Sequence, residues 1–210
     1  NKSRKKVRIA ILRNYTIEPI LSIIKKQLIF KHLKVEFFIS GYEDYATQVL
    51  NIKSKFNKFK PDIVMMFFWL HGFNPSIDYS FGSKEIEKRG RINKNIINEI
   101  RAVINNCRQK FLGPILLGNF PKTYPSKMGL MDFSLDEGTS NTYSFLNNSI
   151  TSICIENKSV YLFDLEAKAY FLGYENFYDS KQWHISMLPF KANAVEYLGI
   201  EISKFCLSFF

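Results

Sequence analysis

Four polar residues at predicted strand ends or shortly before the last predicted helix have side chains of types that can carry out acyl transfer. Thr16 has a hydroxyl that can act as a nucleophile, His184 an imidazole that can act as its base, and Asp179 a carboxylate that can orient the imidazole. Asn74 has an amide that can donate a hydrogen bond to a developing oxyanion, an interaction typically worth about 3–4 kcal/mol. These four residues form the candidate catalytic group.

Each of the four also has a structural interpretation. Thr16 suits the N-cap of a helix that begins at Ile17, and Asn74 is typical of a turn. Asp179 can cap a turn, and His184 can pack on a loop beside its neighbour Trp183. The residue types alone leave both interpretations open.

Five further residues are candidates for substrate binding: Asn14, Gly41, Gly72, His71 and Trp183. Asn14, Gly41 and Gly72 each follow an apolar segment, and we expect them to line one cleft together with Asn74. His71 precedes Gly72 and could face the same cleft. Two histidines without a carboxylate or cysteine at a fitting spacing do not make a metal site, so we predict no metal. Neither the GxGxxG nor the GxxxxGK signature occurs in the sequence, so we predict no cofactor.

The longest apolar run of the sequence, residues 63–70, directly precedes His71, Gly72 and Asn74 and must hold them in place. Its eight residues show no alternation of apolar and polar side chains, which indicates a strand buried on both faces of a parallel sheet. His71, Gly72 and Asn74 then emerge at its carboxyl end, where open α/β sheets bind ligands. The run predicts a central strand in which Val64 and Phe67 are inaccessible to solvent.

Strand-like and helix-like segments alternate along the chain. The predicted strands cover residues 7–12, 33–40, 63–70, 114–120 and 160–164. The predicted helices cover residues 17–31, 45–56, 84–107 with a break at Gly90, 143–156 and 192–205. A polar loop at 75–83, a surface segment at 121–142 and an irregular segment at 164–183 lie between them. Right-handed crossovers then give an α/β fold, a three-layer α/β/α sandwich with a five-stranded parallel sheet of flavodoxin-like order 2-1-3-4-5.

Composition limits the domain count and the classes of partner. The 210 residues, 46% of them hydrophobic, suit one domain over 1–210. The net charge of +10 comes from lysine runs without interleaved exposed aromatics, so we expect no nucleic acid partner. No apolar stretch reaches the roughly 18 residues of a membrane span, so we expect no membrane. Three cysteines without a CxxC pair favour a reducing, cytoplasmic location.

The order of the polar residues resembles that of the SGNH (GDSL-like) hydrolases. That family has a nucleophile turn after its first strand, a glycine after the second, a Gly-x-Asn-Asp after the third and an Asp-x-x-His before the last helix. Gly41, Gly72 with Asn74, and Asp179 with His184 fall at the matching places. In that family the N–H of the nucleophile turn, the glycine N–H and the Asn side chain form an oxyanion hole, so the resemblance implies one made here by the turn after the first strand, the Gly41 N–H and the Asn74 amide.

The chain departs from this family at three places. Arg13-Asn14-Tyr15 stands where the nucleophile turn has Gly-Asp-Ser, which leaves Thr16 as the nearby hydroxyl of the right type. Pro75 replaces the acidic residue of the third block. His184 comes five positions after Asp179 rather than three. These departures bear on catalysis rather than on the fold.

Two segments resemble more closely the N-terminal SGNH-like domain of FkbH-like proteins, in which a HAD-type phosphatase or glyceryl-transferase domain follows. They are IAILRNYTIEPI at residues 9–20 and NFYDSKQWHISMLPF at residues 176–190. The resemblance implies a longer protein in which this chain is the N-terminal part and a HAD-type domain follows.

Two functions follow from this resemblance. The first is hydrolysis or transfer of an acyl or glyceryl ester or thioester, with an Asn/Gly oxyanion site and a histidine base. Its substrate would be a small molecule or a group linked to a carrier protein, and the basic surface would suit an acidic carrier. The second is a catalytically degenerate SGNH-fold module that binds a ligand or serves as a scaffold for a HAD-type domain.

Overall fold

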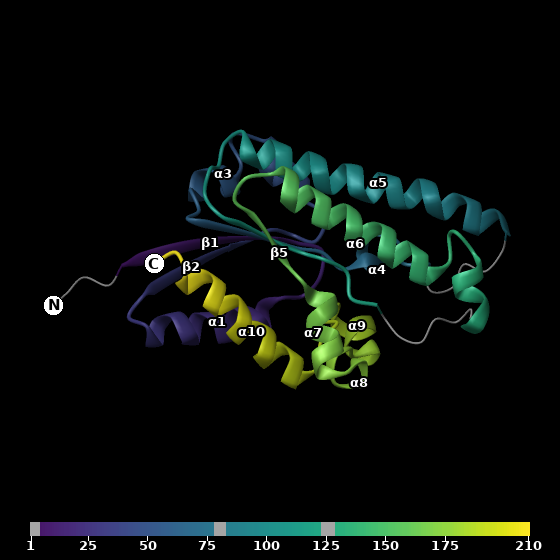
Figure 1. Ribbon diagram of the computed structural model, residues 1–210. Helices are drawn as coiled ribbons and strands as arrows, with labels where there is room; N and C mark the ends of the chain where they lie inside the picture. Colours follow the sequence, from purple (N-terminus) through teal and green to yellow (C-terminus); the bar gives the residue numbers. More distant parts are fainter. Residues whose placement is uncertain (1–4, 78–82, 123–128) are drawn as a thin grey trace.

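A computed structural model describes residues 5–77, 83–122 and 129–210 of the chain, without the side chains of residues 83–87 (Figure 1). Its strands are β1 Lys6–Arg13, β2 Lys34–Ile39, β3 Ile63–Phe67, β4 Ile115–Gly118 and β5 Val160–Phe163. Its helices are α1 Glu18–Phe30, α2 Tyr45–Leu50, α3 Lys55–Phe59, α4 Leu70–Phe73, α5 Ser83–Arg108, the 3-10 turn η1 Gly129–Ser134, α6 Thr139–Glu156, α7 Leu165–Leu172, α8 Tyr174–Phe177, α9 Ser180–Ser186 and α10 Ala192–Leu207.

The strands form one parallel sheet in the order β2-β1-β3-β4-β5, which confirms the predicted topology. Figure 1 shows the sheet nearly edge-on, with α1 and α10 on one face and α5 and α6 on the other. Because all strands run the same way, the turns that follow β1, β2 and β3 meet at one end of the sheet.

β3 is central and fully buried, as its apolar run predicted. Its side chains alternate between the two faces: Ile63, Met65 and Phe67 pack toward α1 and α10, and Val64 and Met66 pack toward α5 and α6. Both Val64 and Phe67 are inaccessible to solvent, with 0% and 1% exposure. The strand is shorter than predicted, because the chain leaves the sheet after Phe67 and begins α4 at Leu70.

Several predicted helices differ from those observed. The helix predicted at 45–56 is two short helices, because the Ser54 side chain accepts from the N–H of Asn57 and starts α3 anew. The predicted break at Gly90 is wrong, since α5 is continuous through it. Gly90 instead makes room for Glu137, whose carboxylate oxygen would lie 2.3 Å from a Cβ at that position.

The two segments predicted to be irregular contain helices. Residues 164–183 include α7, α8 and the first part of α9, and the last part of 121–142 contains η1 and the start of α6. Residues 78–82 of the predicted polar loop and 123–128 of the predicted surface segment lie outside the described residues. In the described part of the chain, no helix has both the length and the apolar character needed to cross a lipid bilayer.

Candidate functional site

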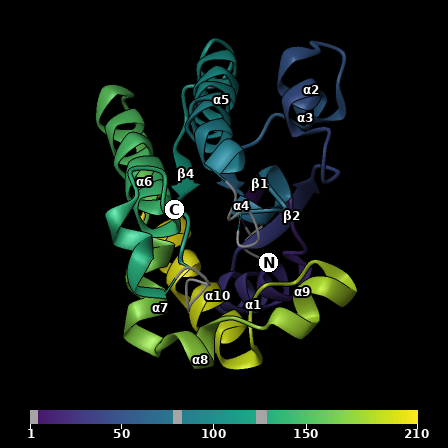
Figure 2. The same cartoon turned by 90° about the vertical axis from the view of Figure 1, so that its right-hand side faces the viewer.

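The candidate site lies where the turns after β1, β2 and β3 meet, at the end of the sheet near α4 and α9 (Figure 2). β1 runs between β2 and β3, so Asn14 is flanked by Gly41 on one side and by Gly72 on the other. The segment after α9 reaches this place from far along the sequence, because the N–H of Thr16 donates to the Met187 carbonyl at 2.9 Å. The fold therefore brings the predicted strand-end residues to one region.

Asn14 fastens the end of β1 to the end of β3. Its Nδ2 donates to the Trp69 carbonyl at 3.1 Å, and its Oδ1 accepts from the Trp69 N–H at 2.6 Å. Gly72 lies directly against this side chain, since a Cβ there would be 2.5 Å from Asn14 Nδ2. The nitrogen and the oxygen of the Asn14 side-chain amide are thus both bonded to buried main chain, a structural role that the prediction of substrate binding did not anticipate.

The Thr16 hydroxyl is held by two partners. Its Oγ1 donates to the Ser186 carbonyl at 2.5 Å, and the Tyr42 hydroxyl lies 2.8 Å away. Since a carbonyl can only accept, the Thr16 proton goes to Ser186 and Tyr42 is the donor of the second bond. The expectation that Thr16 caps α1 is wrong: Ile17 occupies the N-cap position and makes no side-chain cap, while Glu18 accepts from its N–H.

Arg13 ties the first two strand ends together from a buried position. Its Nε donates to the Ser40 carbonyl at 3.1 Å, one terminal nitrogen donates to the Tyr15 carbonyl at 3.0 Å, and the other donates to Glu18 Oε1 at 2.8 Å. Its guanidinium also lies 4.1 Å from the centre of the Tyr42 ring. This large cation stands where a nucleophile turn of the SGNH type has a glycine.

Tyr15, which stands where the serine would be, is a core residue. It is 1% exposed, and its ring makes edge-to-face contacts with Trp69 at 6.2 Å and with Phe190 at 5.6 Å between centroids. Burial raises the pKa of its hydroxyl far above the usual value, although the nearby charge of Arg13 acts in the opposite direction. Tyr15 therefore cannot supply a nucleophile at neutral pH.

Asp179 and His184 are not joined by a hydrogen bond. Asp179 is the N-cap of α9, where its Oδ1 accepts from the N–H of Gln182 at 2.9 Å. His184 is exposed in the last turn of the same helix, and no hydrogen bond links it to Asp179 or to Thr16 in the described part of the chain. The residue three positions after Asp179, where a catalytic histidine would stand, is Gln182.

An aromatic group covers the end of β3. The Trp69 ring stacks on Tyr178 at 5.8 Å and on His71 at 6.3 Å, and Trp183 lies 6.2 Å from Trp69 and 6.0 Å from His71. Trp69 is buried, and within the described residues its Nε1–H has no acceptor in reach. His71 and Trp183, two predicted binding residues, are thus brought together, and Trp69 joins them.

Asn74 and Gly41 occupy the turns in which they were expected. Asn74 is buried, its N–H donates to the Leu70 carbonyl, and its Oδ1 accepts from the Ser76 hydroxyl at 3.0 Å. Gly41 begins the turn after β2, with the Asp44 carboxylate 3.2 Å from the place of a Cβ. Asn74 therefore acts at least as a turn former, the structural alternative that the sequence left open.

Sequence reasoning missed the residues that close the turn after β1. Arg13 had a detectable signal, a cation at a strand end with Glu18 five residues later. Tyr42, Ser186 and Met187 had none, because their contacts with Thr16 span 26 to 171 residues along the sequence. Within the described residues no three His, Cys, Asp or Glu side chains are grouped so that they could hold a metal ion.

The fold and the arrangement of strand-end turns define a member of the SGNH-hydrolase fold class. The family model described as FkbH, N-terminal domain, matches residues 8–204, nearly the whole chain. The chain therefore belongs to the FkbH N-terminal domain family. A comparison with curated protein sequences found no match.

Solved structures share the fold of this chain. The N-terminal part of BF1531 from Bacteroides fragilis, which contains a phosphatase domain, matches 96% of this chain with a TM-score of 0.79 at 16% identity. The diltiazem-metabolizing gut microbial enzyme BT4096 matches 98% with a TM-score of 0.63 at 10% identity. This chain spans about half of each, 51% and 48% of their lengths.

A shorter enzyme also shares the fold. Est24, a carbohydrate acetylesterase from Sinorhizobium meliloti, matches 97% of this chain and is itself covered in full, with a TM-score of 0.51 at 10% identity. At such identities the likeness extends to the fold and not to the activity.

Proposed function

We propose that this chain is a non-catalytic module of FkbH type that binds an acyl or glyceryl group and holds it for a HAD-type phosphatase or transferase domain. The observation that carries the proposal is the closed turn after β1. The Thr16 hydroxyl donates to the Ser186 carbonyl, and the Thr16 N–H donates to the Met187 carbonyl. A hydroxyl that gives its proton to a carbonyl is not activated by a base, and that N–H is not available to an oxyanion.

The rest of the catalytic group supports the same conclusion. Asp179 is occupied as the cap of α9, and His184 is exposed beyond hydrogen-bond reach of Thr16. A serine-type esterase needs the nucleophile, the base and the orienting carboxylate in one chain of hydrogen bonds. In the described part of the chain, Thr16 bonds to the Ser186 carbonyl and Asp179 to the Gln182 N–H, and neither bonds to His184.

Ligand binding is favoured by the aromatic group at the end of β3. The buried Trp69 N–H has no acceptor among the described residues, and leaving such a donor unpaired costs free energy. A carbonyl or hydroxyl oxygen of a ligand would satisfy it, while His71 and Trp183 would pack against the carbon skeleton. The phosphatase domain of the BF1531 structure is consistent with such a module acting beside a second domain.

The first experiment measures turnover of aryl acetates and acyl thioesters at neutral pH. We expect the wild-type chain, Thr16→Val, His184→Ala and Asn74→Ala to hydrolyse them at the rate of the buffer. If the wild type turns over an ester and removal of His184 or Asn74 lowers the rate about 100-fold, the chain is an esterase and the proposal is wrong.

The second experiment measures binding. The chain has two tryptophans, Trp69 and Trp183, and both lie at the site, so their fluorescence reports on a ligand there. We expect glycerate or an acetyl thioester to change the emission saturably, and Trp183→Phe to reduce the change. No saturable change with either probe would contradict the binding function.

A further inference from the structure

β2 forms one edge of the sheet, and in the described part of the chain it pairs with β1 alone. The N–H of Lys34 donates to the carbonyl of Lys5, directly before β1, and the N–H of Ser40 donates to the Ile11 carbonyl of β1. In a parallel ladder, alternate residues direct both main-chain groups to the same neighbour. The N–H and C=O groups of Val35, Phe37 and Ile39 therefore point away from the sheet, as an open template for another strand.

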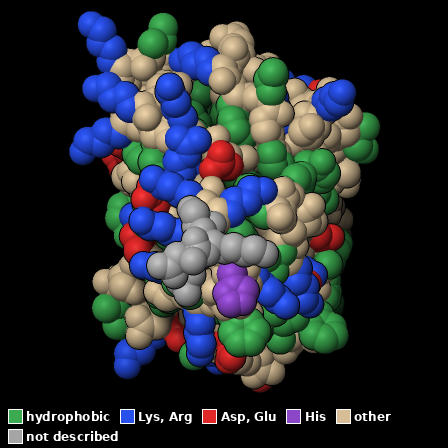
Figure 3. Space-filling view, turned by 90° about the vertical axis from the view of Figure 1, so that its left-hand side faces the viewer, with side chains coloured by type: hydrophobic (Ala, Val, Ile, Leu, Met, Phe, Trp, Pro, Cys, Tyr) green, Lys and Arg blue, Asp and Glu red, His purple; other side chains and the backbone are tan. Residues whose placement is uncertain are grey.

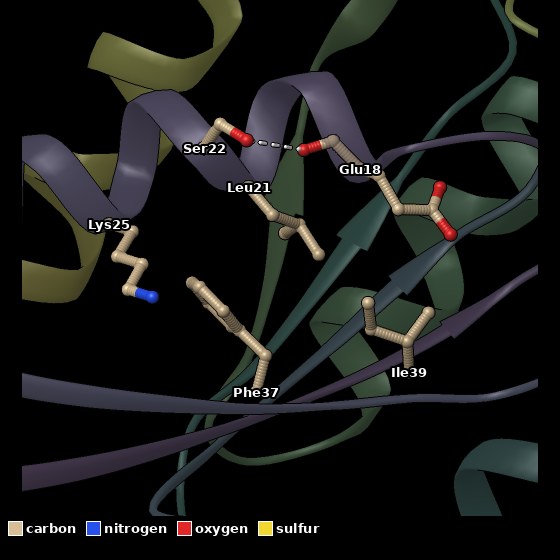
Figure 4. Close-up of a pocket in the computed structure, with 6 residues that line it drawn as sticks. All are labelled: Glu18, Leu21, Ser22, Lys25, Phe37 and Ile39. Carbon is tan, nitrogen blue, oxygen red and sulfur yellow. Dashed lines mark hydrogen bonds between the residues drawn. The ribbon is translucent and has the colours of Figure 1, made fainter.

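The side chains of the same three residues form the floor of a groove between β2 and α1. The groove consists of two adjoining cavities of about 220 and 320 Å³ that share Lys25. Figure 4 shows the first cavity, where Leu21 of α1 points toward Phe37 and Ile39 of β2. The second is lined on the β2 side by Val35. An added strand would thus find hydrogen-bonding groups and an apolar groove side by side.

The charges around the groove are positive once internal ion pairs are taken into account. Glu18 is paired with Arg13, and Glu36 is paired with Lys6 at 2.8 Å. Lys25 lines both cavities and is exposed, and it makes no ion pair with a described residue. The positive field around this edge of the sheet therefore attracts an acidic occupant, including one whose acidic side chains point away from the groove.

We propose that the outer edge of β2 docks an extended acidic segment of a partner protein, which adds to the sheet as a sixth strand. The segment would match the six residues of β2 in length and alternate apolar side chains, directed into the groove, with acidic ones. A second copy of this chain fits less well, because it would bring two molecules of charge +10 together.

The test uses an acetylated and amidated six-residue peptide in which valine alternates with aspartate. A peptide this short should bind with a Kd of about 1 mM, so amide hydrogen exchange is followed by NMR at several millimolar peptide. We expect exchange to slow about 5-fold or more at Val35, Phe37 and Ile39. Glu36 and Phe38, whose amides face β1, should change little, because they are already hydrogen-bonded.

Two control peptides separate backbone pairing from charge. The first is N-methylated on the alternate amides that would face β2, so it cannot pair with β2. The second has lysine in place of aspartate and therefore has the wrong charge. We expect neither to slow exchange on β2. Equal protection by the N-methylated peptide, or no protection by the acidic peptide, would overturn the proposal.

Two variants test the groove itself. Lys25→Glu should weaken binding of the acidic peptide about 5-fold, whereas Lys26→Glu, the same change at the neighbouring exposed residue outside the groove, should weaken it less than 2-fold. Equal effects would show attraction by net charge alone and contradict a specific site. A dimer in sedimentation that protects the β2 edge without peptide would assign the edge to a second copy and likewise reject the acidic partner.

Discussion

Asn14 satisfies two buried main-chain groups with one side chain, so its removal should be costly. Asn14→Ala leaves the Trp69 N–H and carbonyl without their partner, and we expect the free energy of unfolding to fall by about 2–4 kcal/mol. Urea denaturation measures the change. Asn106→Ala is the control, because Asn106 donates to its own helix on the surface and should cost less than about 0.5 kcal/mol. Equal costs would contradict the structural role of Asn14.

The three thiols should be unreactive in the folded chain. Burial raises the pKa of Cys107 and of Cys206 to about 12 and that of Cys154 to about 11, so little thiolate is present at pH 8. We expect iodoacetamide to modify the folded chain at least about 100-fold more slowly than the chain in urea, with half-buried Cys154 reacting first. Mass spectrometry gives the order. Rapid labelling of Cys107 or Cys206 would mean that the helices which carry them open readily.

The identity of the site residues was easier to predict than their roles. Asn14, Gly72 and Asn74 could be selected because each lies shortly after an apolar run that predicts a strand. Their partners do not, since the Asn14 amide is satisfied by a residue 55 positions away and Thr16 by one 170 positions away. Spacing along a sequence gives no access to contacts of that kind, and so the sequence left both the catalytic and the structural interpretation of Thr16 open.

The turn formed by α4 depends on the small size of Gly72. A Cβ in Gly72→Ala would lie 2.5 Å from Asn14 Nδ2, which is itself held by Trp69, so α4 or Asn14 must shift. We expect a loss of about 2–3 kcal/mol in the free energy of unfolding.

Gly41→Ala provides the matched control for Gly72→Ala. Its nearest neighbours would be Asp44 side-chain atoms at 3.2 Å or more, which can move, and the expected loss is below about 1 kcal/mol. Thermal or urea unfolding of both variants makes the comparison. A larger loss at Gly41 than at Gly72 would contradict this account of the two turns.

Among the elements, the strands were the most predictable. β1, β3 and β5 are short apolar runs bounded by polar residues, a pattern that survives in the fold because the sheet is covered on both faces. The helices between β5 and α10 were missed because α7, α8 and α9 are short and lack a clear apolar stripe. The single helix α5 was divided in prediction because the fit of Glu137 against Gly90 is a tertiary contact.

On the scale of the whole molecule, five lysines that make no ion pair with a described residue lie at the end of the sheet opposite the candidate site. Each of them lies in the segment that precedes a strand, so a parallel sheet brings them to the same end of the molecule. They are Lys5, Lys31, Lys60, Lys110 and Lys158. Figure 3 shows lysine and arginine side chains spread over that end. We expect their mutual repulsion to destabilise the chain at low salt.

A salt titration tests this repulsion. Raising sodium chloride from about 10 to about 150 mM should raise Tm by a few degrees, because screening weakens the repulsion between exposed charges. Choline chloride at equal ionic strength should act alike, since the effect does not depend on a particular cation. A Tm that falls with salt would mean that attractive ion pairs outweigh the repulsion.

The two halves of the hydrophobic core share one sheet, so the chain should unfold as one unit. Val64 belongs to the core on the α5 and α6 side, and its neighbour Met65 belongs to the core on the α1 and α10 side. Val64→Ala and Met65→Ala should each lower the free energy of unfolding by about 2–4 kcal/mol, as expected for cavities at fully buried positions. Because β3 supports both faces, each variant should shift one common transition rather than separate a second one.

Urea denaturation followed by tryptophan fluorescence and by far-ultraviolet circular dichroism measures this. The fluorescence of Trp69 reports on one side of the sheet, and the circular dichroism reports on all helices. For both variants we expect the two unfolding curves to coincide and the m-value to stay unchanged. Phe30→Ala is the control, because Phe30 is 78% exposed and its truncation should leave the midpoint nearly unchanged. Two separated transitions in either core variant would show that the layers on the two faces of the sheet fold independently, contrary to a single domain built around β3.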